Sequence, residues 1–403
     1  MAFDIRPIRP EEADEMNRVT RVSFAFPGEV KVKIKPEWTL CAFSDGKMAS
    51  TYAAWPLTMQ LNGRRTPVAG VTMVSTLPIY RRRNYLRKIT SEHFKQLHER
   101  GEQAIAALFA TRTAIYQRYG YAVVSTRNAY KVEPRYIDLI HPPTIPDEFH
   151  EAGDDDLPTM LDLYHRFTEG RTGYLLRNKA FEVAPGAPFT VLKTFMPSSM
   201  MVKVIYIEAG KPAGYVIYTV DRATQPGKPG GQLIHITDLV WLTTSAYRAI
   251  WRYFSNIDLA QDVMWGRVPP DDPLPHLMLE PRNLNVTSGD GLMGRIVDVE
   301  RALPLRPYPD EGRLTFEVID DFCEWNQGRW DADITRDETA VRRSKKSPHL
   351  TMPVSTLAML FFGQISATEA ARMGRLDVSD SKALPLWDRV MRTDYRPFCA
   401  DMF

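Results

Sequence analysis

The sequence predicts a mixed α/β fold (α+β in its last part) divided among several domains. Apolar, β-branched runs alternate with segments of helical periodicity, and one strand–turn–helix layout occurs twice, from Val71 and again from His235. A chain of 403 residues is also long for one hydrophobic core. The usual domain size divides such a chain into about two to four domains. We therefore expect mixed sheets with helices packed against them.

A strand, a basic turn and a helix follow one another at residues 71–97. The β-branched run VTMVSTL ends at a proline, the triplet Arg81–Arg83 follows, and apolar residues then recur at helical spacing. The first amides of such a helix have no internal partners, and amides beside guanidinium groups bind phosphate. An isolated arginine run is more often a solvated loop. Its position between a strand and an amphipathic helix favours a site for a phosphorylated cofactor.

The next elements make a family resemblance specific. A short strand is predicted at 104–109 and a short helix at 112–119, and Tyr121 follows Gly120 directly. The segment PIYRRRNYLRKI resembles the R-x-x-G-x-G/A loop of GNAT acetyltransferases. ATRTAIYQRYGYA resembles the segment that carries the general-acid tyrosine in the Eis-type aminoglycoside acetyltransferases. The resemblance implies acetyl-coenzyme A as cosubstrate and direct transfer of its acetyl group to an amine.

The resemblance also implies which residues bind acetyl-coenzyme A. A splayed strand leaves main-chain groups free for the pantetheine arm, while amides after the arginine triplet face the pyrophosphate. The sequence departs from the family pattern at Leu86 and at Asn84, where glycine is usual; asparagine tolerates positive φ, although it leaves less room for the cofactor. The expected cofactor-binding residues are Val74, Ser75, Thr76, Arg81, Arg82, Arg83, Asn84, Tyr85, Leu86, Arg87, Thr111 and Tyr116.

A second unit is expected after the proline-rich linker HPPTIPDEF. Strands are predicted at 201–208 and 213–218, and the repeated layout from His235 has a turn without arginines or glycine, so this GNAT-like unit is expected to bind no cofactor. His235 and Asp238 point to opposite faces of a strand, which argues against a catalytic pair and makes His235 structural. The segment AVVSTRNAYKV (122–132) is expected to complete the first sheet.

The third unit is predicted to contain strands with polar turns and an apolar helix at 354–362. This pattern resembles the sterol-carrier-like domain that ends Eis-type proteins, so the resemblance covers essentially the whole chain. The expected domains are a catalytic GNAT domain at 1–140, a second GNAT-like domain at 150–300 and a sterol-carrier-like α+β domain at 301–403. A lipid carrier is the competing class, although apolar helical residues are more often core than ligand wall.

The two catalytic residues follow from the resemblance. Tyr121 is expected to act as the general acid that protonates the departing thiolate. In this family the chain end threads into the acetyltransferase site, so the carboxylate of Phe403 is expected to act as general base. A free α-carboxylate has a pKa of about 3.5 in solution, and burial would have to raise it. The alternative is a frayed terminus, but the ending FCADMF is apolar enough to be buried.

No sequence motif marks the acceptor-binding residues, so they are predicted from residue type and position. Phe24 and Phe26 lie on a broken loop after the first helix, where they either line the acceptor pocket or plug the edge of the core. Trp38 is a candidate stacking wall, and Asp401, with Glu29 and Glu37, is a candidate carboxylate for a cationic acceptor. The expected partner is a small-molecule amine, an aminoglycoside-like polyamine or a lysine. Family members form hexamers, so we expect a homo-oligomer.

Composition excludes several other classes. A net charge of +2 with 25% charged residues, and no basic stripe with interleaved aromatics, argues against nucleic-acid binding. No apolar run approaches the roughly twenty residues of a membrane span, and the first residues lack a signal-peptide core, so we expect a cytoplasmic protein. Cys41, Cys323 and Cys399 lack metal-binding spacing, and no metal is expected. An acetyl-coenzyme A sensor without turnover is the remaining alternative.

Overall fold

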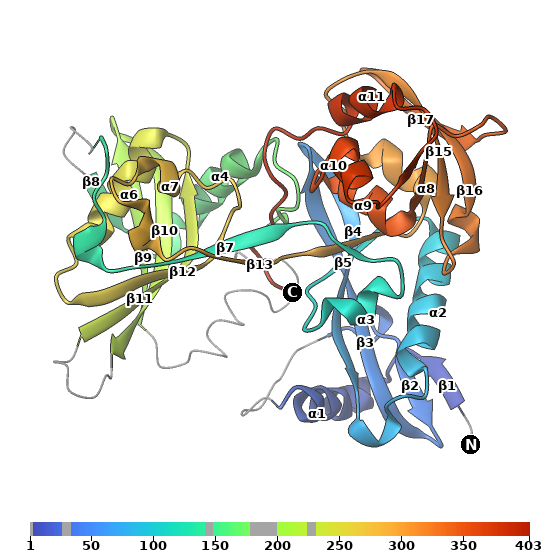
Figure 1. Cartoon of the computed structure of the whole chain (residues 1–403). Helices are drawn as coiled ribbons and strands as arrows, with labels where there is room; N and C mark the ends of the chain where they lie inside the picture. The colour runs from blue at the N-terminus through green and yellow to red at the C-terminus, as the bar shows by residue number, and fades with distance from the viewer. Residues whose placement is uncertain (1–2, 26–33, 142–147, 178–199, 224–230) are drawn as a thin grey trace.

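The computed structural model describes residues 3–25, 34–141, 148–177, 200–223 and 231–403. Within these ranges the strands form two seven-stranded sheets and one five-stranded sheet, with helices packed against them, which confirms the predicted mixed α/β class (Figure 1). Figure 1 also shows that the C terminus lies between the two larger units, far from the N terminus in the same view.

The first sheet has the strand order β1-β2-β3-β4-β5-β14-β6. Helix α1 covers one face of it with Met16 and Val19, and helix α2 covers the other face with Ile89 and Phe94. The elements of this unit are β1 (Phe3–Arg6), α1 (Ala13–Phe24), β2 (Cys41–Ser44), β3 (Lys47–Leu61), β4 (Arg64–Thr76), α2 (Tyr85–Arg100), β5 (Ile105–Leu108), α3 (Thr113–Gln117), β6 (Ala122–Val123) and β14 (Met293–Ile296).

Local turn chemistry explains the two hairpins of this sheet. Asp45 and Gly46 join β2 to β3, and Asn62 and Gly63 join β3 to β4, and all four residues have positive φ. Two-residue turns of this kind match the twist of the flanking strands, and Asn-Gly and Asp-Gly are the pairs that adopt them most readily. The sequence predicted both turns correctly.

The second sheet has the strand order β13-β7-β12-β11-β10-β9-β8. Its β10–β11–α6–β12 segment repeats the β3–β4–α2–β5 layout, with β11 and β12 parallel as β4 and β5 are. Thr243 caps α6, as predicted, by accepting a hydrogen bond from the Ala246 amide. The elements are β7 (Thr126–Val132), β8 (Glu148–Glu151), α4 (Leu157–Thr168), β9 (Met200–Glu208), β10 (Lys211–Ala223), β11 (Gly231–Trp241), α6 (Thr244–Ser255), β12 (Ala260–Val268), α7 (Leu274–Leu277) and β13 (Thr287–Asp290).

The two sheets exchange strands. The prediction that 122–132 completes the first sheet was wrong, because only β6 stays there while β7 pairs with β12 and β13 in the second sheet. In return, β14 inserts between β5 and β6 of the first sheet. The predicted ranges 1–140 and 150–300 therefore do not correspond to separate sheets. Figure 1 shows β7 and β13 running side by side between the two units.

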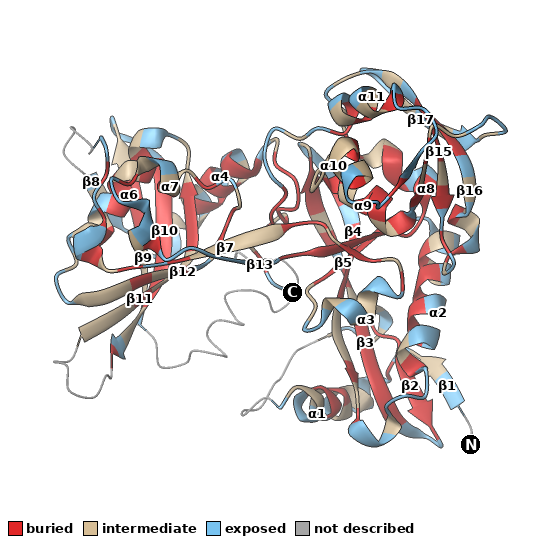
Figure 2. Ribbon diagram, in the orientation of Figure 1, coloured by how far each residue is buried: buried red, intermediate tan, exposed pale blue. Residues whose placement is uncertain are grey.

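The third sheet has the order β17-β16-β15-β18-β19. Helix α9 is core, as the sequence favoured: Leu357, Leu360 and Phe361 are fully buried, and Phe362 reaches Gly294 on β14 of the first sheet. Figure 2 shows this buried helix against the buried strands of the first unit. The elements are α8 (Val299–Ala302), β15 (Gly312–Ile319), β16 (Gly328–Ile334), β17 (Thr339–Arg343), β18 (Leu350–Pro353), α9 (Val354–Phe362), α10 (Ala367–Arg372), β19 (Asp377–Val378) and α11 (Ala383–Val390).

Short 3-10 turns connect many of these elements. They are η1 (Pro10–Glu12), η2 (Pro36–Trp38), η3 (Pro78–Tyr80), η4 (Pro134–Tyr136), η5 (Asp154–Asp156), η6 (Pro281–Leu284), η7 (Leu303–Leu305) and η8 (Glu324–Asn326). The cysteines Cys41, Cys323 and Cys399 are free and buried, as expected of apolar fillers, and burial raises the pKa of each thiol to about 12. Among the described helices, none combines the length and the apolar character needed to span a bilayer.

Candidate active site

The strands β4 and β5 lie side by side for only a short distance and then separate. Ala69 pairs with Ala106 and Gly70 with Ala107, and these are the pairings between the two strands within the described residues. On the other side of β4, a bulge that includes Met73, with φ of 50°, shifts the register against β3. Bulges bend and twist a strand. The splayed strand predicted at this position is therefore confirmed.

Only some of the predicted main-chain groups face the resulting gap. The carbonyl of Ser75 accepts a hydrogen bond from Ser50 Oγ on β3 (2.6 Å), and the Ser75 hydroxyl lies 2.6 Å from the Thr51 hydroxyl. Since main-chain groups alternate sides along a strand, Val74 and Thr76 direct theirs away from β3, toward the gap. Val74 and Thr76 thus fit the predicted pantetheine contacts, whereas Ser75 faces β3 and does not.

The arginine loop adopts the left-handed turn that Asn84 was expected to tolerate. Asn84 (φ 62°) is the N-cap of α2, and Arg82 also has a positive φ of 63°. The guanidinium of Arg81 donates to the Thr76 carbonyl (3.3 Å), which ties the loop to the end of β4. Arg82 and Arg83 are exposed beside the unpaired amides at the start of α2. Exposed guanidinium groups, free amides and the open edge of β4 together fit a pyrophosphate followed by a pantetheine arm.

Other predicted cofactor residues differ in exposure. Tyr85 is buried at the start of α2, Leu86 packs against the core beneath the helix, and Arg87 lies over the ring of Phe322 (5.2 Å) from the third unit. Thr111 is exposed just before α3. Tyr116 on α3 packs edge to face against Tyr121, with ring centroids 6.0 Å apart.

Tyr121 is held in the core on the α2 side of the first sheet. The side chain is 1% exposed, packs beside Phe94 and Tyr116, and its hydroxyl makes no hydrogen bond with the part of the chain that the structure describes. Burial, followed by the charge of Tyr116, raises the pKa of the Tyr121 phenol well above its usual value. The phenol is therefore protonated at neutral pH and has a proton to donate.

A buried arginine from the exchanged strand fixes the turn before Tyr121. Arg295 on β14 donates to the Tyr119 carbonyl (2.8 Å) and forms an ion pair with Asp320 of the third unit (2.7 Å). A Cβ on Gly120, which has φ of 80°, would approach this guanidinium to 2.9 Å. Gly120 is thus required both for its left-handed conformation and for close packing on Arg295. Sequence reasoning missed Arg295, because only the strand exchange brings it to this turn.

Phe403 lies where β4 and β5 diverge. Its ring packs edge to face on Phe109, with centroids 5.4 Å apart, and lies 3.1 Å from the position of a Cβ on Gly70. The neighbours of Gly70 on β4, Ala69 and Val71, belong to the cluster under α2, so Gly70 and Phe403 are on the opposite face. The chain end therefore lies at the gap, and Tyr121 is on the opposite face of the sheet.

The chain end is anchored by a buried charge cluster. The Arg177 guanidinium pairs with Asp401 (2.8 Å) and with Asp238 on β11 (2.5 Å), and the Tyr164 hydroxyl donates to Asp401 (3.2 Å). Asp401 was expected to contact an acceptor, but its carboxylate is buried and bound to Arg177 instead. Asp238 faces this cluster while His235 lies near Asp221 (3.5 Å), so the two residues form no pair, as predicted.

A second arginine holds the residues before Asp401. Arg267 on β12 donates to the carbonyls of Cys399 (2.5 Å) and Ala400 (3.2 Å), and its guanidinium lies 4.7 Å above the ring of Phe109. Phe109 therefore contacts both Arg267 and Phe403. Nothing in the sequence pattern around Arg267 or Arg177 pointed to their contacts with the tail, since the tail residues that they bind are more than 130 positions away.

The predicted acceptor residues are not brought together. Phe24 ends α1 and is partly buried, and Phe26 lies outside the described residues, as does Glu29. Trp38 and Glu37 line a pocket of about 250 Å³ against α2. That pocket is also lined by Tyr52 on the α2 face, while Trp38 packs against the hydrophobic cluster on which Phe403 also packs.

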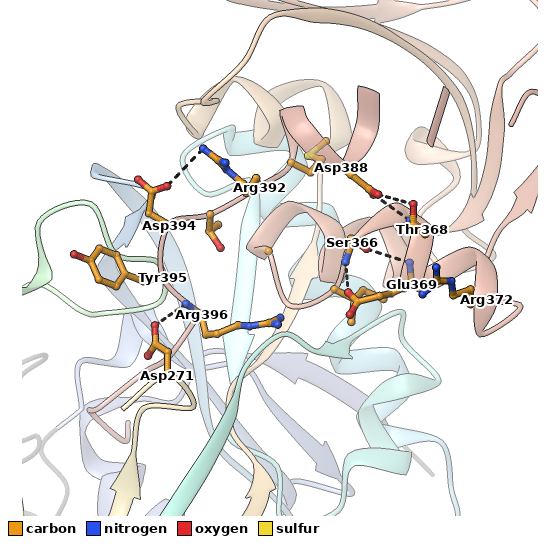
Figure 3. A pocket seen from close by; sticks show the side chains of 14 residues that line it. Asp271, Ser366, Thr368, Glu369, Arg372, Asp388, Arg392, Asp394, Tyr395 and Arg396 are labelled. Atoms are coloured by element: carbon orange, nitrogen blue, oxygen red, sulfur yellow. Dashed lines mark hydrogen bonds and ion pairs between the residues drawn. The ribbon is translucent and has the colours of Figure 1, made fainter. Parts of the chain in front are cut away.

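A further pocket, of about 590 Å³, lies between α10, α11 and the tail at 391–396 (Figure 3). Two of its carboxylates accept hydrogen bonds from main-chain amides of the lining: Asp388 accepts from the Thr368 amide (3.0 Å), and Asp271 accepts from the Arg396 amide (2.9 Å). Figure 3 shows these contacts within the lining. Neither Tyr121 nor Phe403 contributes to this pocket, so it is separate from the candidate active site.

Comparisons with known proteins agree with this architecture. Models described as an acetyltransferase (GNAT) domain match residues 4–124 and 189–296, and a sterol carrier protein domain model matches 299–400. The N-acetyltransferase Eis of Mycobacterium bovis is 27% identical over 81% of this chain and 79% of its own length. The crystal structure of Eis1 from Mycobacterium abscessus has a TM-score of 0.84 at 25% identity, over 99% of this chain and 100% of that one. The chain belongs to the Eis-type GNAT acetyltransferases.

Membership of the Eis type identifies the chain as an N-acetyltransferase that uses acetyl-coenzyme A. An uncharacterized N-acetyltransferase of Streptomyces avermitilis is 28% identical over 100% of this chain and 99% of its own length, so the full three-unit architecture is shared. The second matched GNAT region has no arginine loop, because the turn before α6 consists of Thr243–Ser245.

Replacement of Arg177 by methionine is expected to destabilise the protein strongly. The change leaves Asp238 and Asp401 buried without a cation, and breaking a buried ion pair in this way costs about 3–5 kcal/mol. Urea unfolding measures the loss. The matched control is Arg166→Met on α4, whose exposed pair with Asp162 should contribute less than about 1 kcal/mol. Adding Asp238→Asn and Asp401→Asn to Arg177→Met should recover part of the stability; no recovery would contradict the charge explanation.

Proposed function

We propose that the enzyme transfers the acetyl group directly from acetyl-coenzyme A to an amine at the gap between β4 and β5. In this proposal the Phe403 carboxylate takes the proton of the acceptor amine as the C–N bond forms. Tyr121 gives its phenolic proton to the sulfur as the C–S bond breaks. The observation that supports this best is that the ring of Phe403 lies beside Gly70 where β4 and β5 diverge, while Tyr121 is buried on the opposite face of the same sheet.

The assignment of Tyr121 as the acid is supported by its surroundings. Burial keeps the Tyr121 phenol protonated at neutral pH, so a proton is present at this position when the thiolate departs. Its hydroxyl is also not bound by another protein group within the described residues, which leaves the proton available. Holding both reactants in one gap supplies much of the remaining acceleration.

The assignment of Phe403 as the base is supported by how firmly the tail is held. Three successive residues before Met402 are bound by Arg177 and Arg267, and Phe403 itself packs on Phe109. Terminal residues usually fray unless they are tied down in this manner.

We propose an aminoglycoside-like polyamine or a lysine as the acceptor. The residues that would bind it are expected on the Phe403 face of the gap, where Phe24 and Phe26 remain the predicted wall. A lipid carrier is disfavoured because the apolar residues of α9 are packed in the core. We also propose that the protein assembles into a homo-oligomer of six subunits, as expected from the family. A cytoplasmic location is a further part of the proposal.

Purified protein is expected to release thiol from acetyl-coenzyme A only when a suitable amine is present. Aminoglycosides, polyamines and lysine-containing peptides are assayed in parallel, and mass spectrometry of the amine checks for a gain of one acetyl group. Release that depends on one class names the acceptor. Cofactor binding without release with any amine would favour the sensor, and co-purified lipid without cofactor binding would favour the carrier.

Replacement of Tyr121 by phenylalanine is expected to lower kcat by about 100-fold or more, because a positioned general acid contributes 10²–10⁴-fold. Cofactor affinity should change little, since the hydroxyl makes no contact with the arginine loop. Tyr119→Phe is the matched control, a neighbouring tyrosine on the same turn that should keep near-normal turnover. Full activity of Tyr121→Phe would remove the assigned acid.

Extension of the chain by two residues, Gly-Ser, after Phe403 is expected to abolish most turnover while sparing cofactor binding. The extension moves the carboxylate away from the position that Phe403 occupies against Phe109. Phe403→Leu, which keeps both the terminal carboxylate and an apolar side chain, serves as control and should retain much more activity. Equal activity of the extended protein and the control would exclude the terminal carboxylate as base.

A further inference from the structure

The proposed acid must recover its proton after each transfer. Tyr121 loses a proton to the departing sulfur, and its side chain is 1% exposed even without a bound cosubstrate. Bulk water therefore has little direct access to the phenol. A route through neighbouring protein groups would return the proton while the site is closed.

The first group on such a route is Tyr52 on β3. Tyr52 and Tyr121 belong to one buried cluster under α2, and burial, followed by the charge of Tyr121, raises the pKa of the Tyr52 phenol, although no hydrogen bond joins the two hydroxyls in this structure. Since the Tyr121 hydroxyl is otherwise without a partner, a tyrosinate formed there would attract the Tyr52 hydroxyl proton. A small rotation of either ring would then complete the contact.

The second group is His93 on α2. The Tyr52 hydroxyl lies 2.8 Å from His93 Nδ1, at hydrogen-bond distance. Burial lowers the pKa of His93 to about 3, with a smaller contribution from Arg100, so the imidazole is neutral at pH 7. A neutral imidazole has one nitrogen that donates and one that accepts. It can take a proton at Nε2 while it gives one from Nδ1.

The route ends in the pocket that contains Trp38. His93 and Tyr52 both line this pocket of about 250 Å³, together with the polar side chains of Gln96, Arg100 and Glu102. The volume is sufficient for several water molecules, and polar side chains provide their partners. The pocket that was expected to hold the acceptor thus connects the Tyr52–His93 pair with solvent.

We propose that His93 and Tyr52 form a proton relay that returns a proton from the solvent-filled pocket to Tyr121 after each acetyl transfer. The proton of Tyr52 passes to the Tyr121 oxygen, the Nδ1 proton of His93 passes to Tyr52, and His93 Nε2 takes a proton from water. Each step breaks one bond to hydrogen and forms another, and the hydroxide left by the water is neutralised by the proton that the Phe403 carboxylate took from the amine. Exchange of the imidazole with water restores its starting tautomer. This inference rests on the proposed function of Tyr121.

Chemical rescue of His93→Ala tests the relay. The variant should lose at least about tenfold in kcat with little change in KM, since a missing proton-transfer group slows turnover without touching substrate binding. Added imidazole should restore turnover, because the space left by the side chain opens into the pocket. 1-Methylimidazole should not, because it fills the same space but has no N–H to pass on. The matched control is His98→Ala on the same helix, whose ring pairs with Asp298 instead.

The outcomes separate the relay from the proposed function. Unchanged kcat in a folded His93→Ala protein, or equal rescue by both additives, would overturn the relay. If His93→Ala does not fold, His93→Gln keeps a hydrogen-bond partner for Tyr52 and should still lose turnover; normal turnover there would also overturn it. Tyr121→Phe is measured alongside: a normal Tyr121→Phe overturns the acid itself, whereas an impaired Tyr121→Phe with a normal His93→Ala overturns only the relay.

Discussion

The ion-pair cluster of Arg177, Asp238 and Asp401 is the constraint on which the candidate active site depends. It lies in the second unit, yet it fixes the last residues of the third unit against a strand gap of the first. Burying three charges is costly unless they are paired and hydrogen-bonded, and here Tyr164 and Tyr215 supply further hydrogen bonds. The geometry of the chain end is therefore a property of all three units together.

The strand exchange provides the second long-range constraint. Because β14 is inserted between β5 and β6, Arg295 lies beneath the turn that carries Tyr121 and reaches Asp320 in the third unit. Tyr121, the proposed acid, is thus positioned by a residue that is 174 positions later in the chain. The two units cannot separate without breaking both seven-stranded sheets, which gives the site a rigid frame.

The gap between β4 and β5 separates two chemical environments. On the α2 face, Tyr121 is surrounded by aromatic rings, and Tyr52 and His93 continue from it toward a polar pocket. On the other face, the chain end lies beside Phe109 and Gly70. In the proposed mechanism the acid and the base thus lie on opposite faces of one sheet, which keeps them from neutralising each other.

The sequence by itself determined the local parts: the hairpin turns, the helix caps, the arginine loop with Asn84 in a left-handed conformation, and the repeated layout of the second unit. Each of these depends on residues that are neighbours in the chain, so periodicity and turn chemistry suffice. The tertiary structure alone decided the strand exchange, the burial of Asp401 and the orientation of Ser75 toward β3. These depend on contacts between residues far apart in sequence, and two strands of similar apolar character carry no local signal that says which sheet each will join.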